Sequence, residues 1–256
     1  MTANRILTNV LAQSSRSRSL SIRRFVNHSF RVANIARKHG WLPGARYTNL
    51  RDIRQFERLG FLDIDWKNYS FTRHLNAARS TRPILTVARD IENIDDLCRT
   101  LDEAHELSRY ADEVIIVPKD PRLRECLDEA IPSGFLLGFS VPTRYGGTVI
   151  PTTAFRRPVH LLGGRPDVQR RLASVLPVVS IDCNRFTLDA SFGDYFDGDC
   201  FRPHPKGGYD RCLEASIRNI NKLWLDYDIS RHWGGRDEAQ RHARKDHRNL
   251  LGGSLR

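Results

Sequence analysis

The sequence has no acidic residue before Asp52, so its first 51 positions form one continuous basic zone. The whole chain carries 41 Lys and Arg residues against 30 Asp and Glu residues, which gives a formal net charge of +11. A surplus of this size indicates a polyanionic partner, nucleic acid before a membrane. The alternative is that the charge serves solubility alone.

Paired cysteines and long apolar runs are also missing. The five cysteines, at positions 98, 126, 183, 200 and 212, form no CxxC pair. An odd count without such a pair does not suggest a disulfide framework and favours a reducing, cytoplasmic setting. No apolar run approaches the roughly 20 residues that cross a bilayer, so we expect no membrane partner. The basic, Ser-rich beginning of the chain lacks the apolar segment of a secretory signal.

Cys200, His204 and Cys212 raise the question of a zinc site. Their spacing matches no compact structural zinc motif, and a fourth ligand would have to be Cys183 or an acid. We therefore predict that the chain holds no metal.

Short apolar runs alternate with helical stretches through most of the chain, as β/α units require. Strands are predicted at residues 61–65, 83–90, 113–117, 135–141, 158–163 and from 178 onward. Helices are predicted at residues 50–59, 71–80, 95–110, 121–130, 167–175 and 209–224. The Gly and Pro residues of 40–44 predict a turn. The strands are almost continuously apolar, so the sheet should be parallel and buried on both faces.

A TIM-like (β/α) barrel explains this alternation better than an open doubly wound sheet. No Gly-rich dinucleotide turn follows the first strand, and polar residues follow every strand. Because six strands are counted, a complete barrel needs one more before Asp52 and one after Asn184; otherwise it is incomplete or irregular. We predict a basic, flexible arm at residues 1–29, the barrel at 30–228 and a basic polar tail at 229–256.

Carboxylates stand at the carboxyl ends of three predicted strands: Asp63 or Asp65, Asp90, and Asp182. In a barrel these ends meet at one mouth, where the chemistry of the fold is carried. Several carboxylates in one pocket suit reactions at the anomeric carbon of a sugar, where one attacks C1′ and another moves protons. The alternative for each is that it caps the following helix.

Other strand ends supply groups for binding a substrate. These are Lys119, Gly138, Phe139, Ser140, Arg144, Tyr145, Gly163 and Gly164. The lysine places a cation at the mouth, and the Gly-Phe-Ser segment offers main-chain groups beside a flat ring. Arg and Tyr among glycines suit phosphate contact and base stacking. The Gly-Gly turn before a predicted helix is of a kind that cradles phosphate.

The order of these motifs resembles that of the tRNA-guanine transglycosylase superfamily. Residues 161–164, Leu-Leu-Gly-Gly, and 180–183, Ser-Ile-Asp-Cys, are similar to two motifs of that family. The resemblance implies a barrel in which Asp182 is the covalent nucleophile. It also implies that Asp63 or Asp65 is the general acid/base.

The same resemblance assigns the recognition of the base. It gives this role to Asp90, with Gly138, Phe139 and Ser140 as the Gly-rich base-binding loop.

Two features of the tRNA enzymes are absent here. The Cys-x-Cys-x-x-Cys zinc cluster is missing, and Asn184-Arg185-Phe186 stands where those enzymes have Pro-Thr-Arg. The chain therefore looks more like the phage and bacterial branch that inserts 7-deazaguanines into DNA. This resemblance implies a pentosyltransferase that exchanges guanine in DNA, or else tRNA, for a free 7-deazaguanine base such as preQ0, without a cofactor.

Two other functions fit the same residues. One is a non-catalytic, basic nucleic-acid-binding barrel, such as an accessory subunit of such an enzyme. The other is a hydrolase of N-glycosidic bonds that uses water in place of an incoming base. An accessory protein or a homodimer is compatible with each of them.

Overall fold

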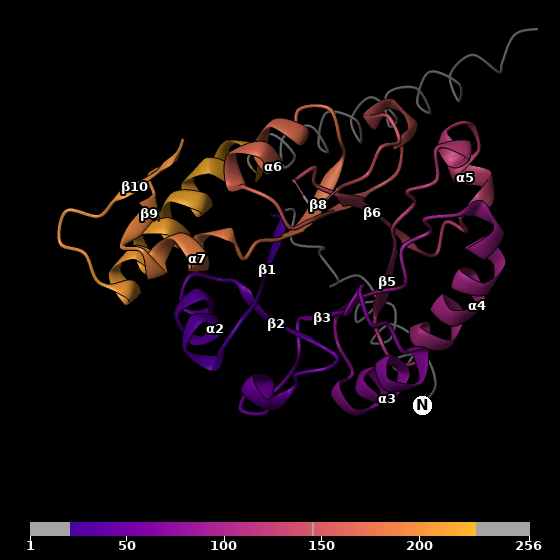
Figure 1. Cartoon of the computed structure of the whole chain (residues 1–256), viewed down its shortest axis with the longest axis horizontal. Helices are drawn as coiled ribbons and strands as arrows, with labels where there is room; N and C mark the ends of the chain where they lie inside the picture. Colours follow the sequence, from indigo (N-terminus) through magenta and orange to yellow (C-terminus); the bar gives the residue numbers. More distant parts are fainter. Residues whose placement is uncertain (1–20, 145, 229–256) are drawn as a thin grey trace, which may run out of the picture. The chain divides into compact units, whose positions relative to one another are not determined.

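Eight short parallel strands close into a barrel in which each strand pairs with its neighbour in sequence and β8 pairs with β1 (Figure 1). The computed structural model describes residues 21–144 and 146–228. The strands are β1 (Arg23–Asn27), β2 (Leu42–Arg46), β3 (Phe61–Asp63), β4 (Leu85–Val87), β5 (Glu113–Ile116), β6 (Leu136–Ser140), β7 (Val159–Leu162) and β8 (Val178–Asp182). The predicted fold class, an α/β TIM-like barrel, is confirmed, and the barrel is complete.

Helices follow most strands and lie outside the barrel, as Figure 1 shows for α3, α4 and α5. They are α2 (Phe30–Arg37), α3 (Phe71–Thr81), α4 (Leu97–Ser108), α5 (Leu127–Ala130), α6 (Pro166–Leu172) and α7 (Arg185–Ser191). Four 3₁₀ turns are η1 (Arg51–Ile53), η2 (Ile94–Asp96), η3 (Pro121–Glu125) and η4 (Thr152–Ala154). In α4 the buried residues Thr100, Ala104 and Leu107 recur at helical spacing, so one stripe of the helix is buried.

The region after β8, for which no period was predicted, contains α7 and a small antiparallel pair, β9 (Asp194–Phe196) and β10 (Phe201–Pro203). Residues 209–228 are helical. The barrel belongs to a compact unit of residues 23–225. The second unit comprises residues 1–22 and 226–256. Within its described part, the main-chain N–H of Ile22 donates to Asp228 at 2.7 Å.

Aromatic rings fill the interior of the barrel. The ring centroids of Phe25 and Phe61 are 5.7 Å apart, and that of His160 lies 5.3 Å from Phe61. All three side chains are fully buried. Because the interior is packed, the open space of the barrel is restricted to the strand ends above these rings.

Both barrel strands that were not predicted, β1 and β2, lie before Asp52, so the expectation of one barrel strand after Asn184 was wrong. The predicted turn at residues 40–44 overlaps β2, which contains Pro43 and Gly44. The Pro43 carbonyl accepts a hydrogen bond from the Gly60 N–H at 2.8 Å, so the proline still takes part in the sheet through its acceptor.

Strand β1 lies inside the range predicted as an arm, so the barrel begins earlier than the predicted boundary at residue 30. The predicted helix at residues 50–59 is reduced to η1, and the one at 121–130 is divided into η3 and α5. Residues 1–20 of the predicted arm and the predicted tail at 229–256 lie outside the described residues. Within the part that is described, no helix is both long and apolar enough to cross a bilayer.

Gly138 provides a test of the packing at the top of the barrel. A Cβ atom there would lie 2.6 Å from Ile115, 2.7 Å from Val117 and 2.9 Å from Leu162. Gly138→Ala should therefore lower the free energy of unfolding by about 1–3 kcal/mol in urea titrations. Gly134→Ala is the control, because nothing lies within 4 Å of its added Cβ, and its effect should stay within about 0.5 kcal/mol. Equal effects of the two substitutions would contradict this packing.

Candidate active site

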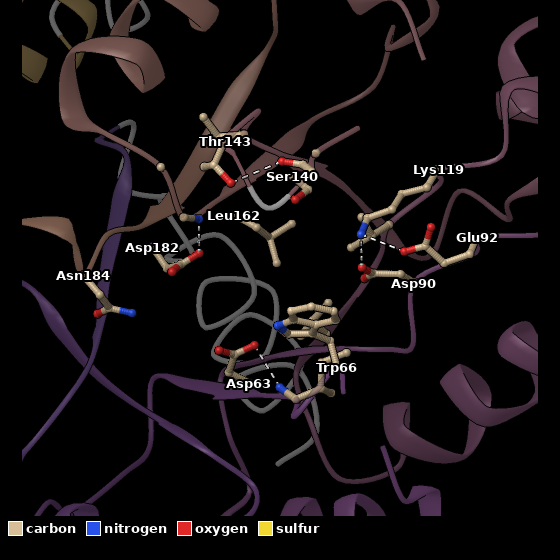
Figure 2. A pocket seen from close by; sticks show the side chains of 18 of the residues that line it. Asp63, Trp66, Asp90, Glu92, Lys119, Ser140, Thr143, Leu162, Asp182 and Asn184 are labelled. Atoms are coloured by element: carbon tan, nitrogen blue, oxygen red, sulfur yellow. Dashed lines mark hydrogen bonds and ion pairs between the residues drawn. The ribbon is translucent and has the colours of Figure 1, made fainter. Parts of the chain in front are cut away.

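A cavity of about 470 Å³ opens at the carboxyl ends of the barrel strands (Figure 2). Four acidic and two basic side chains lie in its wall: Asp63, Asp90, Glu92, Asp182, Arg46 and Lys119. They come from the ends of β2, β3 and β8 and from the segments that follow β4 and β5. The cavity therefore occupies the place where barrels of this kind carry their chemistry.

Asp182 is the last residue of β8 and is 6% exposed. Its Oδ1 accepts a hydrogen bond from the Gly163 N–H at 2.9 Å. The Gln169 amide donates to the main-chain carbonyls of both Asp182 and Gly163, at 2.7 Å each, and so joins the ends of β7 and β8. The carboxylate is thus held in one orientation by main-chain and side-chain contacts.

A buried histidine lies next to this carboxylate. His160 Nδ1 is 2.8 Å from Ser180 Oγ, and its Nε2 is 3.4 Å from Asp182 Oδ1. Burial lowers the pKa of His160, and Asp182 opposes that shift. A neutral ring that accepts the Ser180 hydroxyl proton at Nδ1 carries its own proton on Nε2, where it faces Asp182.

Asp63, at the end of β3, has a different environment. Burial and the nearby charge of Asp182 raise its pKa to about 7. Hydrogen bonds from the Ile64 N–H at 2.8 Å and from Asn27 Nδ2 at 3.0 Å oppose this rise. Asp63 can therefore hold a proton near neutral pH, as a general acid must.

Asn27 of β1 connects the ends of β3 and β8. Its side chain donates to Asp63, and its main-chain N–H donates to Asn184 Oδ1 at 2.8 Å. Asn27 reaches Asp63 across β2 because residue 44 is a glycine, where a Cβ would lie 1.6 Å from Asn27 Oδ1. This oxygen is buried without a hydrogen-bond partner. If the side-chain amide were flipped, the oxygen would accept a hydrogen bond from the protonated carboxyl group of Asp63.

Lys119 and two acids form a second polar cluster in the wall. Lys119 Nζ lies 2.6 Å from Asp90 Oδ2 and 2.9 Å from Glu92 Oε1. Burial raises the pKa of Asp90, and the adjacent ammonium opposes this rise. Burial alone would lower the pKa of Lys119, but Asp90 and Glu92 outweigh it and raise that pKa. The two acids therefore keep the amine charged.

Most of the predicted site residues line this one cavity. They are Asp63, Asp90, Lys119, Ser140, Gly163, Gly164 and Asp182. Gly163 and Gly164 have positive φ angles of 62° and 86°, which only glycine adopts readily. The Gly163 N–H donates to Asp182 and is therefore not available to the phosphate that this turn was predicted to cradle.

Other predicted residues lie elsewhere. Asp65 lies beyond the end of β3, outside the lining, and accepts a hydrogen bond from the Lys67 N–H at 3.3 Å. Phe139 projects from the other face of β6 and packs on Phe155, with ring centroids 5.2 Å apart. Gly138 lies among apolar side chains and also does not line the cavity.

Two of the predicted site residues lie in the loop after β6. Arg144 is exposed and is not part of the lining. Tyr145 lies outside the described residues.

Cys200, His204 and Cys212 are the residues considered above for a zinc site. Cys212 is buried, and Arg202 contacts the Cys200 sulfur at 3.6 Å. Among the described residues there is no group of three or more His, Cys, Asp or Glu side chains placed to hold a metal ion.

The lining residues that sequence reasoning missed include Arg46, Trp66, Glu92 and Asn184. Arg46 was missed because β2 was taken for a turn. Trp66 lies three residues past the end of β3, Glu92 five residues past the end of β4 and Asn184 two residues past the end of β8. A search of the first five positions after each strand would have included them, because the loops after the strands form the barrel mouth.

These features define a complete (β/α) barrel with a carboxylate-lined cavity at the strand carboxyl ends. The chain belongs to a family of unknown function, DUF6610, whose model matches residues 36–225. No curated protein is recognisably similar to it in sequence. Among solved structures it is similar to the YdjI aldolase from Escherichia coli K12, with 13% identity and a TM-score of 0.49, over 85% of this chain and 95% of that chain.

The raised pKa of Asp63 predicts a pH-dependent loss of stability. As pH rises from the ordinary Asp value of 3.8 to about 7, the unfolded chain releases this proton while the folded protein keeps it, so stability falls. Asp63→Asn removes this effect. At pH 8 the variant should be about 2 kcal/mol more stable than wild type, less than the full linkage energy because Asp63 lines an open cavity.

The measurement is urea unfolding of wild type and variant at pH 3, 5 and 8. At pH 3 the two proteins should agree within about 0.5 kcal/mol, because Asp63 is then protonated in both states. A difference in stability that does not change with pH would contradict the assignment.

Proposed function

We propose that the chain is a base-exchanging pentosyltransferase that replaces guanine in nucleic acid, in DNA rather than tRNA, by a 7-deazaguanine such as preQ0. One observation carries the proposal. Asp182 and Asp63 line the same cavity, and main-chain hydrogen bonding holds the first while burial keeps a proton on the second. Displacement at an anomeric carbon needs such a pair, one carboxylate as nucleophile and one carboxylic acid as proton donor.

The first step forms a covalent intermediate. Asp182 Oδ1 is held by Gly163 and faces His160, whereas no described residue bonds Oδ2, so Oδ2 attacks C1′. The bond between C1′ and N9 of guanine breaks, and its electron pair goes to the base. Asp63 donates its proton to the departing guanine.

The second step reverses the roles. Asp63, now a carboxylate, takes the proton from the ring nitrogen of the incoming 7-deazaguanine. That nitrogen attacks C1′ and releases Asp182. The two steps return both acids to their starting states, and no redox cofactor takes part.

The cavity suits a base taken out of a nucleic acid. Its volume of about 470 Å³ falls in the range of sites that enclose a small ligand. Trp66 lines it and is 60% exposed. Lys67 Nζ lies over one face of the indole, 5.2 Å from the ring centroid, so a flipped base would stack on the other face. The net charge of +11 favours binding to a phosphate backbone, and the affinity should fall as salt increases.

The choice of DNA rests on the sequence resemblance. The chain lacks the Cys-x-Cys-x-x-Cys cluster of the tRNA enzymes and differs from them immediately after Asp182. Both substrates are therefore tested in parallel.

The test is uptake of radiolabelled guanine into DNA and into tRNA. Wild type should incorporate the label into DNA, and unlabelled preQ0 should compete with it. Asp182→Asn should reduce incorporation at least about 1,000-fold, and Asp63→Asn about 100-fold. Asp65→Asn is the matched control and should retain wild-type activity, because Asp65 does not line the cavity.

Three results would contradict the proposal. Incorporation at the wild-type rate by Asp182→Asn would show that Asp182 is not the nucleophile. Release of guanine without uptake of label would indicate the N-glycosidic hydrolase. Binding of nucleic acid with neither release nor uptake would indicate a binding protein.

A further inference from the structure

The Lys119 ammonium has one N–H group available to a ligand. Of its three N–H groups, the contacts to Asp90 and Glu92 occupy two, and no described residue accepts the third. The side chain is 19% exposed and lines the cavity. Asp90 Oδ1 likewise has no hydrogen-bond partner among the described residues. The pair therefore presents one donor and one acceptor side by side.

This pair lies across the cavity from the nucleophile candidate. In the closed barrel β4 is opposite β8, and Lys119 follows β5, the neighbour of β4. Figure 2 shows Lys119 and Asp90 on one side and Asp182 on the other, with Trp66 and Asp63 between them. A nucleotide whose C1′ lies at Asp182 thus directs the far edge of its base toward Lys119.

We propose that Lys119 is a further catalytic residue, which donates a hydrogen bond to the 6-oxo group of the base while Asp90 accepts one from the adjacent N1–H. This inference rests on the proposed function. Guanine and 7-deazaguanine both carry an oxygen at C6 beside a protonated nitrogen, which matches the donor and acceptor of the pair. Adenine carries an amino group at C6 and no hydrogen on N1, so the same pose places the ammonium against a donor.

A cation at this place acts on the chemical step as well as on binding. When the bond between C1′ and the base breaks, its electron pair enters the ring system, which spreads the charge onto O6. A fixed ammonium stabilises this charge more in the transition state than in the ground state. Asp90 and Glu92 hold the ammonium in place, so little reorganisation is needed. The incoming 7-deazaguanine uses the same contact because it keeps O6 although it lacks N7.

The first test is binding of free bases by titration calorimetry. The probes are 7-deazaguanine, hypoxanthine and adenine, with wild type, Lys119→Met and the control Lys206→Met. Lys206 is exposed and lies outside the lining. Lys119→Met should bind both 6-oxo bases about 10-fold to 100-fold more weakly than wild type and the control do. Adenine should bind weakly to all three proteins.

Removal of Lys119 leaves two acids without their cation, which can destabilise the fold. A second variant therefore separates a loss of binding from a loss of folding. The double variant Lys119→Met with Glu92→Gln removes one of these charges, keeps the Asp90 acceptor and should show the same loss of 6-oxo base binding. In the exchange assay, Lys119→Met should lower kcat at least about 10-fold at saturating DNA. Unchanged binding and unchanged kcat in a Lys119→Met protein would overturn the role of Lys119.

The results separate this inference from the proposed function. If wild type exchanges bases and the Lys119 variants behave like wild type, the Lys119 role fails and the exchange function stands. If wild type binds 6-oxo bases through Lys119 but exchanges none, the subsite stands and the transferase function and the catalytic role of Lys119 fail. If wild type binds none of the bases, both fail.

Discussion

The pairing of β8 with β1 is the constraint on which the site depends. It closes the barrel, with Asp182 in register with Phe25 of β1 and the Cys183 N–H donating to the Phe25 carbonyl at 3.1 Å. Closure brings the end of the last strand next to Asn27, which bonds both Asn184 and Asp63. Two acids that are far apart in sequence therefore face one cavity. If the sheet stayed open between β8 and β1, Asp63 and Asp182 would be separated even with every other strand pair formed.

The two acids of the cavity have different surroundings. Asp182 Oδ1 accepts a hydrogen bond from the Gly163 N–H and lies 3.4 Å from His160 Nε2. Asp63 also accepts two hydrogen bonds, but burial and the charge of Asp182 outweigh them. The negative charge of Asp182 makes ionisation of Asp63 more costly, and this asymmetry is what the proposed nucleophile and proton donor require.

The sequence predicted the barrel and much of the cavity because strand ends obey a simple rule. Asp90, Lys119 and Asp182 follow apolar runs and therefore meet at the mouth, whereas β2 was hidden by Pro43 and Gly44. Whether Asp63 or Asp65 lines the cavity depended on where β3 ends. Phe139 was wrongly expected in the cavity because the sequence did not show which face of β6 points inward. Such details follow from register and packing, which depend on residues distant in sequence.

The central claim is that Asp182 carries the sugar during the reaction. The most direct measurement is to mix the protein with guanine-containing DNA, denature it during turnover, digest both components and identify the modified peptide by mass spectrometry. The account predicts a pentose-linked adduct on Asp182 that disappears when excess 7-deazaguanine is added before denaturation. An adduct on another residue, or exchange that proceeds with no adduct at all, would contradict it.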